Sequence, residues 1–79
     1  MERVGKKMLE NRCDYINRLM RTPDMVHIEY YNGMSRVCKF IEAGEIMGRT
    51  NYCTHNLSLL GTKRESLNFL NGMAAGLTA

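Results

Sequence analysis

The chain has 79 residues, with 11 lysines and arginines against 8 aspartates and glutamates, and a net charge of +3. This charge is weaker than the strongly basic balance of dedicated nucleic-acid binders. The longest uncharged run, 66–79, is too short and too polar to span a bilayer. The three cysteines include no C-x-x-C pair and do not form the dense disulfide framework of small secreted domains. We therefore expect a single domain over residues 1–79, in a reducing cytoplasmic setting.

The first predicted element is an amphipathic helix from about Arg3 to Arg21. Apolar side chains recur at helical spacing on one face of it, at Leu9, Cys13, Ile16 and Met20. Pro23 ends this helix, because the residue before a proline, here Thr22, is pushed toward extended geometry.

Two alternating apolar and polar runs between Met25 and Glu42 flank the dipeptide Asn32-Gly33 and predict a β-hairpin. Both residues of this dipeptide accept positive φ, as a two-residue type I′ turn requires. The turn sets the register, which pairs Tyr31 with Met34, Glu29 with Arg36, Ile28 with Val37 and His27 with Cys38. Because side chains alternate along a strand, the hairpin has two faces. The expected core face carries Val26, Ile28, Tyr30, Val37 and Ile41, and the other face carries His27, Glu29, Tyr31, Met34, Arg36, Cys38 and Phe40.

The segment after the hairpin is harder to interpret. We expect Ala43-Gly44 to break the second strand and a third strand to form around Arg49 to His55. The leucines that follow, Leu57, Leu59 and Leu60, are expected to pack inward.

A capping box at Thr62-Lys63-Arg64-Glu65 predicts a second helix from about Lys63. Its apolar face is formed by Leu67, Leu70, Ala74 and Leu77, broadened by Phe69 and Met73. Gly72 and Gly76 are unfavourable in a helix interior, so we expect either fraying after Asn71 or a close neighbour beside them. The predicted fold is a single small α+β domain, in which a short antiparallel sheet packs with an N-terminal and a C-terminal helix. Which helix covers which sheet face is left open.

Four residues are candidates for a metal site: His27 and Cys38, which the hairpin register sets opposite each other, with Cys53 and His55. Zinc sites of this kind normally contain tight local ligand pairs, which the chain lacks. The same residues, taken as a cysteine nucleophile with a histidine base, lack a signature that would orient them. We therefore predict no metal, no other cofactor and no enzymatic activity.

The exposed hairpin face contains the residue types that are enriched in protein interfaces, and it predicts a partner-binding surface formed by Tyr31, Met34, Arg36 and Phe40. The alternative is that the N-terminal helix covers this face. A second hypothesis is a small nucleic-acid-binding protein. It would bind the nucleic acid through Arg36, Arg49, Lys63 and Arg64. A third hypothesis is a homo-oligomer that sequesters a nucleotide between its subunits.

The capping box Thr62-Lys63-Arg64-Glu65, followed by Phe69-Leu70 and Gly72-Met73, resembles the C-terminal part of small accessory proteins encoded by bacteriophages. This resemblance is confined to the last part of the chain, from about Thr62 onward. It implies a compact protein of the host cytoplasm that binds and inhibits a host machine, as anti-CRISPR and other anti-defence inhibitors do. The leading hypothesis is a non-enzymatic binding module that occupies a host protein or ribonucleoprotein surface.

Overall fold

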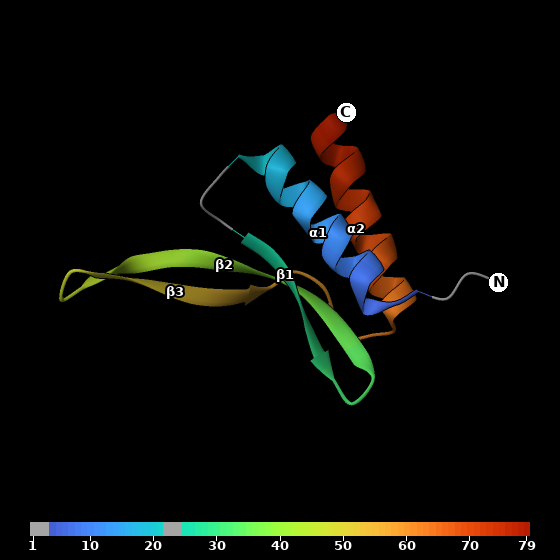
Figure 1. Ribbon diagram of the computed structural model, residues 1–79, viewed down its shortest axis with the longest axis horizontal. Helices are drawn as coiled ribbons and strands as arrows, with labels where there is room; N and C mark the ends of the chain where they lie inside the picture. The colour runs from blue at the N-terminus through green and yellow to red at the C-terminus, as the bar shows by residue number, and fades with distance from the viewer. Residues whose placement is uncertain (1–3, 22–24) are drawn as a thin grey trace.

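The computed structural model describes residues 4–21 and 25–79. The elements are α1 (Lys6–Met20), β1 (Met25–Tyr31), β2 (Met34–Ile46), β3 (Arg49–Asn56) and α2 (Lys63–Thr78). The three strands form one antiparallel sheet in the order β1-β2-β3 (Figure 1). The predicted small α+β domain with an N-terminal and a C-terminal helix is confirmed. Neither helix in the described ranges is long and apolar enough to cross a membrane.

The first hairpin forms in the predicted register. Asn32 and Gly33 have φ of 46° and 80°, so both turn residues adopt the positive φ that a type I′ turn needs. Glu29 lies opposite Arg36, and His27 lies opposite Cys38. The local turn chemistry was therefore enough to set the pairing of β1 with β2.

Both helices pack on the same face of the sheet (Figure 1). This is the face that carries Val26 and Val37, while α1 and α2 also pack against each other. The buried core consists of Leu9, Cys13, Ile16, Val26, Val37, Leu70 and Ala74. The opposite sheet face, which we call the outer face, is left uncovered by the helices. This arrangement settles the competition between the helices that the sequence left open.

Backbone and polar contacts tie the helices and loops to the sheet. The Asn17 side chain donates to the Val26 carbonyl at 3.0 Å and accepts from the Val26 N–H at 2.7 Å, which fastens α1 to β1. On the other side of β2, Gly61 exchanges two backbone hydrogen bonds with Ser35. The buried hydroxyls of Ser35 and Ser66 share a hydrogen bond of 2.7 Å. These contacts satisfy polar groups that would otherwise be costly to bury.

The expected break at Ala43-Gly44 is wrong, because β2 continues to Ile46 through a bulge between Glu42 and Gly44. A bulge absorbs an extra residue and bends the strand without ending it. The predicted third strand is confirmed as β3, and a second two-residue turn at Met47 and Gly48, with φ of 53° and 77°, joins it to β2. The far part of this second hairpin, residues 41–54, projects away from the helices (Figure 1), and we call it the arm.

Several expectations about packing are corrected. Leu57 packs against the core, but Leu59 is 91% exposed and Leu60 is also exposed, because the backbone of this loop makes the contact with β2. Ile41, expected in the core, lies at the base of the arm and is only partly buried.

The second helix also departs from expectation at its glycines and at its end. It continues to Thr78, beyond the expected fraying point at Asn71, and Leu77 near its end is exposed. A Cβ atom added at Gly72 or Gly76 would meet no other element of the described structure within 4 Å, so the expected close neighbour is not seen there either. The predicted helix start at Arg3 and the predicted stop at Thr22 and Pro23 lie outside the described residues.

Candidate functional site

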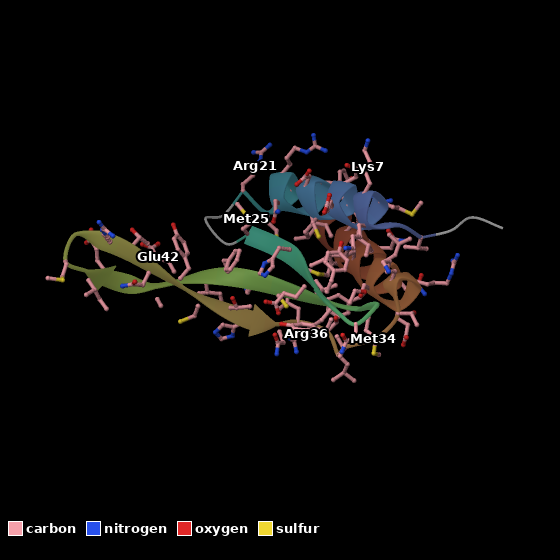
Figure 2. All side chains as sticks on the ribbon, turned by 60° about the horizontal axis from the view of Figure 1, so that its bottom comes forward. Lys7, Arg21, Met25, Met34, Arg36 and Glu42 are labelled. Carbon is pink, nitrogen blue, oxygen red and sulfur yellow. The ribbon has the colours of Figure 1, made fainter. Side chains whose placement is uncertain are left out.

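The four predicted partner-binding residues lie together on the outer face. Tyr31 and Met34 face each other across the turn, and both are exposed. Phe40 is exposed further along β2, and Arg36 lies between Met34 and Phe40 on the same strand face. Figure 2 shows Met34 and Arg36 on the side of the sheet opposite to α1. The alternative in which the N-terminal helix covers this surface is wrong.

A polar cluster occupies the middle of the outer face. The Glu29 Oε1 atom accepts three hydrogen bonds: from Arg36 Nη2 at 3.0 Å, from the Tyr31 hydroxyl at 3.2 Å and from the Cys38 thiol at 3.2 Å. The Arg36 guanidinium also lies 5.1 Å from the centroid of the Tyr31 ring. These contacts, led by the Arg36 hydrogen bond, hold the pKa of Glu29 below its ordinary value. Two of the predicted anchors are thus held in place by the carboxylate of Glu29.

Beside this cluster, His27 and Phe40 stack with their ring centroids 4.0 Å apart and their planes 11° from parallel. Cys38, directly opposite His27, is completely buried, and burial is the main reason that its thiol pKa is raised. The Nδ1 atom of His27 is buried and makes no hydrogen bond within the described residues. The ligand atoms of His27, Glu29 and Cys38 all lie within 4.8 Å of one another.

The structure therefore divides the four metal candidates into two pairs. His27 and Cys38 come together as the register predicted, whereas Cys53 pairs with Ile41 and His55 pairs with Lys39, which alternation places on the other sheet face. Sequence reasoning missed Glu29 as a member of the group. Glu29 lies two residues from His27 on the same strand, which places both side chains on one sheet face. From the sequence, Glu29 was considered only as the partner of Arg36.

The four basic residues predicted to bind nucleic acid do not lie together in the structure. Arg49 follows the turn at the tip of the arm, while Lys63 and Arg64 lie at the start of α2, at the other end of the molecule (Figure 1). Arg36 is engaged with Glu29 on the outer face. The geometry does not create a continuous basic stripe from these residues.

The arm adds a surface that sequence reasoning did not identify. All eight residues of β3 are exposed, and so are the last residues of β2. Large apolar side chains near the tip are open to solvent: Met47 is 97% exposed, Ile46 is 65% exposed and Tyr52 is 58% exposed. The glycine at position 48, directly before the predicted third strand, was the available turn signal for this hairpin.

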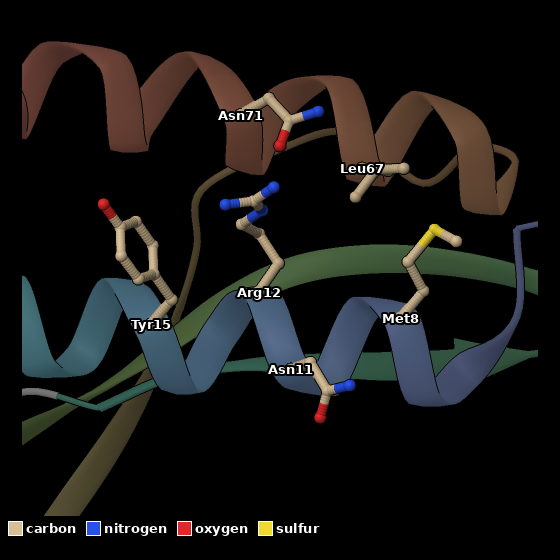
Figure 3. A pocket seen from close by; sticks show the side chains of 6 residues that line it. All are labelled: Met8, Asn11, Arg12, Tyr15, Leu67 and Asn71. Atoms are coloured by element: carbon tan, nitrogen blue, oxygen red, sulfur yellow. The ribbon is translucent and has the colours of Figure 1, made fainter.

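A groove of about 390 Å³ runs between α1 and α2 (Figure 3) and is lined by Met8, Asn11, Arg12, Tyr15, Leu67 and Asn71. Arg12 extends from α1 toward α2, with its guanidinium 5.5 Å from the centroid of the Tyr15 ring. The lining includes neither a carboxylate nor a thiol. The outer face and the arm are the stronger candidate surfaces.

Comparisons of the chain with protein-family models, with curated proteins and with solved structures find no match. Function is therefore inferred from the surfaces themselves.

Proposed function

We propose that the protein is a non-enzymatic binding module that captures another protein through the outer face of its sheet and the arm. The resemblance of the C-terminal segment to phage accessory proteins suggests the class of partner: a host protein or ribonucleoprotein whose activity is inhibited when it is bound. In this proposal Tyr31, Met34, Arg36 and Phe40 form one part of the contact surface, and the tip of the arm forms the other.

The observation that carries the proposal is the arm. An isolated two-stranded hairpin is only marginally stable in water, and no residue of the arm belongs to the buried core. The arm nevertheless presents Ile46, Met47 and Tyr52 to solvent. A partner protein would cover these side chains and supply packing that the rest of the described chain does not provide.

The open edge of β3 supports the same proposal. In the described part of the chain β3 pairs with β2 on one side only. An exposed strand edge offers a row of backbone N–H and C=O groups, to which an extended segment of another protein can add as a further strand. Backbone pairing would supply affinity, and the side chains of the arm would supply specificity.

Charge favours a protein over a nucleic acid as the partner. The arm carries two acidic residues, Glu42 and Glu45, and one basic residue, Arg49, so its net charge is −1. On the outer face the charge of Arg36 is compensated by Glu29. Neither surface therefore concentrates the positive charge that neutralises phosphates.

The test is affinity capture from a nuclease-treated bacterial lysate with four tagged baits: the wild type, Tyr31→Ala/Arg36→Ala, Met47→Ser/Tyr52→Ala and Leu77→Ala. Leu77 is a matched control because it is an exposed apolar residue at the end of α2, away from both surfaces. We expect one set of proteins to co-purify with the wild type and with the control. Each double variant should retain its circular dichroism spectrum and lose at least about tenfold in captured partner, since a few anchors dominate interfaces of this kind.

Equal capture by all four baits would remove both surfaces from the proposed interface. The same capture is repeated from a lysate without nuclease. Proteins that co-purify there and are lost on nuclease treatment would indicate a ribonucleoprotein partner, whereas nucleic acid that co-purifies without any protein would support the nucleic-acid-binding alternative.

A further inference from the structure

Three side chains with metal-binding atoms converge on the outer face. His27 and Glu29 are two residues apart on β1 and so point to the same side, and Cys38 lies directly opposite His27 on β2. Their ligand atoms lie within 4.8 Å of one another, and the Cys38 sulfur is 3.2 Å from Glu29 Oε1. The first hairpin thus presents a nitrogen, an oxygen and a sulfur donor to a single point.

This donor set and its spacing suit zinc. Zinc accepts histidine nitrogen, cysteine sulfur and carboxylate oxygen, and a site with three protein ligands leaves a fourth position for water or another group. The bond lengths of a tetrahedral zinc site place its ligand atoms roughly 3.3 to 3.6 Å apart. The Cys38 sulfur lies 3.2 Å from Glu29 Oε1, slightly closer than this range, and the ligand atoms of all three residues lie within 4.8 Å of one another. Side-chain rotations alone are therefore enough to bring the three ligand atoms to the spacing of a zinc site.

The surroundings of the three residues are consistent with such a site. Among residues 4–21 and 25–79 the buried Nδ1 atom of His27 has no hydrogen-bond partner, an unfavourable state that a bond to a metal would relieve. Stacking against Phe40 holds the plane of the imidazole ring. The Asn56 side-chain oxygen accepts from the Cys38 thiol at 3.6 Å. When the thiol gives up its proton to bind a metal, the Asn56 amide has to turn so that its N–H donates to the sulfur as an outer contact from β3.

The positive charge of Arg36 disfavours a second cation nearby, but the proposed ligands would neutralise the charge of the ion. A divalent ion with one thiolate, one carboxylate and a neutral imidazole forms a group of zero net charge. The three hydrogen bonds that described residues donate to the Glu29 side chain end on Oε1, so the carboxylate can keep its contact with Arg36 while Oε2 turns toward the ion. Arg36 then orients a ligand from outside, as outer hydrogen-bond partners do in metal sites.

We propose that His27, Glu29 and Cys38 form a three-ligand site for zinc or a similar divalent transition-metal ion on the outer face of the sheet. The sequence-level prediction of no metal relied on the absence of short ligand pairs. A hairpin register and an i, i+2 spacing along β1 bring the ligands together without such pairs.

The test uses the full-length protein after chelator treatment and removal of any tag, titrated with Zn²⁺ and separately with Co²⁺. We expect one equivalent of each ion to bind and the cobalt form to show a thiolate-to-cobalt charge-transfer band. Cys38→Ser should abolish this band, and His27→Gln and Glu29→Gln should each weaken zinc binding by at least about tenfold. The matched control is Cys53→Ser/His55→Gln, which removes the exposed thiol and imidazole of the opposite sheet face and should change neither readout.

His27→Gln keeps the buried Cys38 thiol in place, so it tests the site even if Cys38→Ser does not fold. Absence of binding to the folded wild type would overturn the proposal. So would binding that survives in His27→Gln and Glu29→Gln but is lost in the Cys53→Ser/His55→Gln control. Neither result would bear on partner capture through the arm.

Discussion

The three cysteines of this chain have different environments and therefore different chemistry. Cys53 is exposed on β3, while Cys13 and Cys38 are buried. Burial, assisted by the negative charges of Asp14 and Glu10, raises the pKa of Cys13 to about 11. Because the thiolate is the reactive form, Cys13 is an inert core residue, and Cys53 is the accessible thiol.

The raised pKa of Cys13 makes stability depend on pH in alkaline solution. The unfolded chain loses this thiol proton near pH 9, whereas the folded chain keeps it until about pH 11. Between these values the unfolded state binds fewer protons, so the free energy of unfolding falls as pH rises. Relative to Cys13→Ala, the wild type should lose on the order of 2 kcal/mol between pH 9 and pH 11. Urea denaturation of both proteins at the two pH values measures this, and a constant difference would contradict it.

At the scale of elements, β2 has two functions along its length. Its first part pairs with β1 and buries Ser35 and Val37 beneath the helices, whereas its last part, from Glu42 onward, is exposed and forms the arm with β3. The bulge between Glu42 and Gly44 marks this change. A bulge that increases local bending suits a hairpin that must leave the surface of the domain.

The arm should be removable without unfolding the domain. Ile41 and Cys53 are paired across the two strands, so replacing residues 42–52 with Asn-Gly closes them with a two-residue turn. We expect the free energy of unfolding in urea to change by less than about 1 kcal/mol, because the shorter connection costs less closure entropy and no core residue is lost. Partner capture should be lost. Loss of cooperative unfolding would show instead that the arm stabilises the domain.

At the scale of the whole molecule, one core holds the chain together from a single side of the sheet. Residues of both helices and of β1 and β2 meet there, and the loop before α2 completes the edge of β2 through Gly61 and Ser35. A domain of this size has a small stability margin. The outer face and the arm are consequently available for contacts that do not compete with folding.

Leu70 and Leu59 provide a matched test of this arrangement. Leu70 is completely buried between the helices and the sheet, and Leu59 is almost completely exposed. Leu70→Ala should lower the free energy of unfolding by about 2–5 kcal/mol through lost burial and the remaining cavity. Leu59→Ala should change it by less than about 0.5 kcal/mol. Chemical denaturation measures both, and similar losses for the two variants would contradict the assigned core.

Features that depend on neighbouring residues were predictable from the sequence. The Asn32-Gly33 turn determined the register of the first hairpin, including the opposition of His27 and Cys38. The capping box determined the start of α2: Thr62 Oγ1 accepts from the Glu65 N–H at 3.1 Å, and Glu65 Oε1 accepts from the Thr62 N–H at 3.0 Å. Turn geometry and helix capping act within a few residues, so the sequence contains their physical cause.

Only the tertiary structure decided which sheet face is covered and that the arm leaves the domain. Both faces of the first hairpin carry bulky side chains, so burial alone could not assign the helices to one of them. The choice depends on the sum of contacts among α1, α2 and the sheet, which join residues far apart in the chain. The candidate metal site lies on the outer face, which stays uncovered because both helices pack on the opposite face. A local pattern determines which residues share a face, but long-range packing determines whether that face is free to bind.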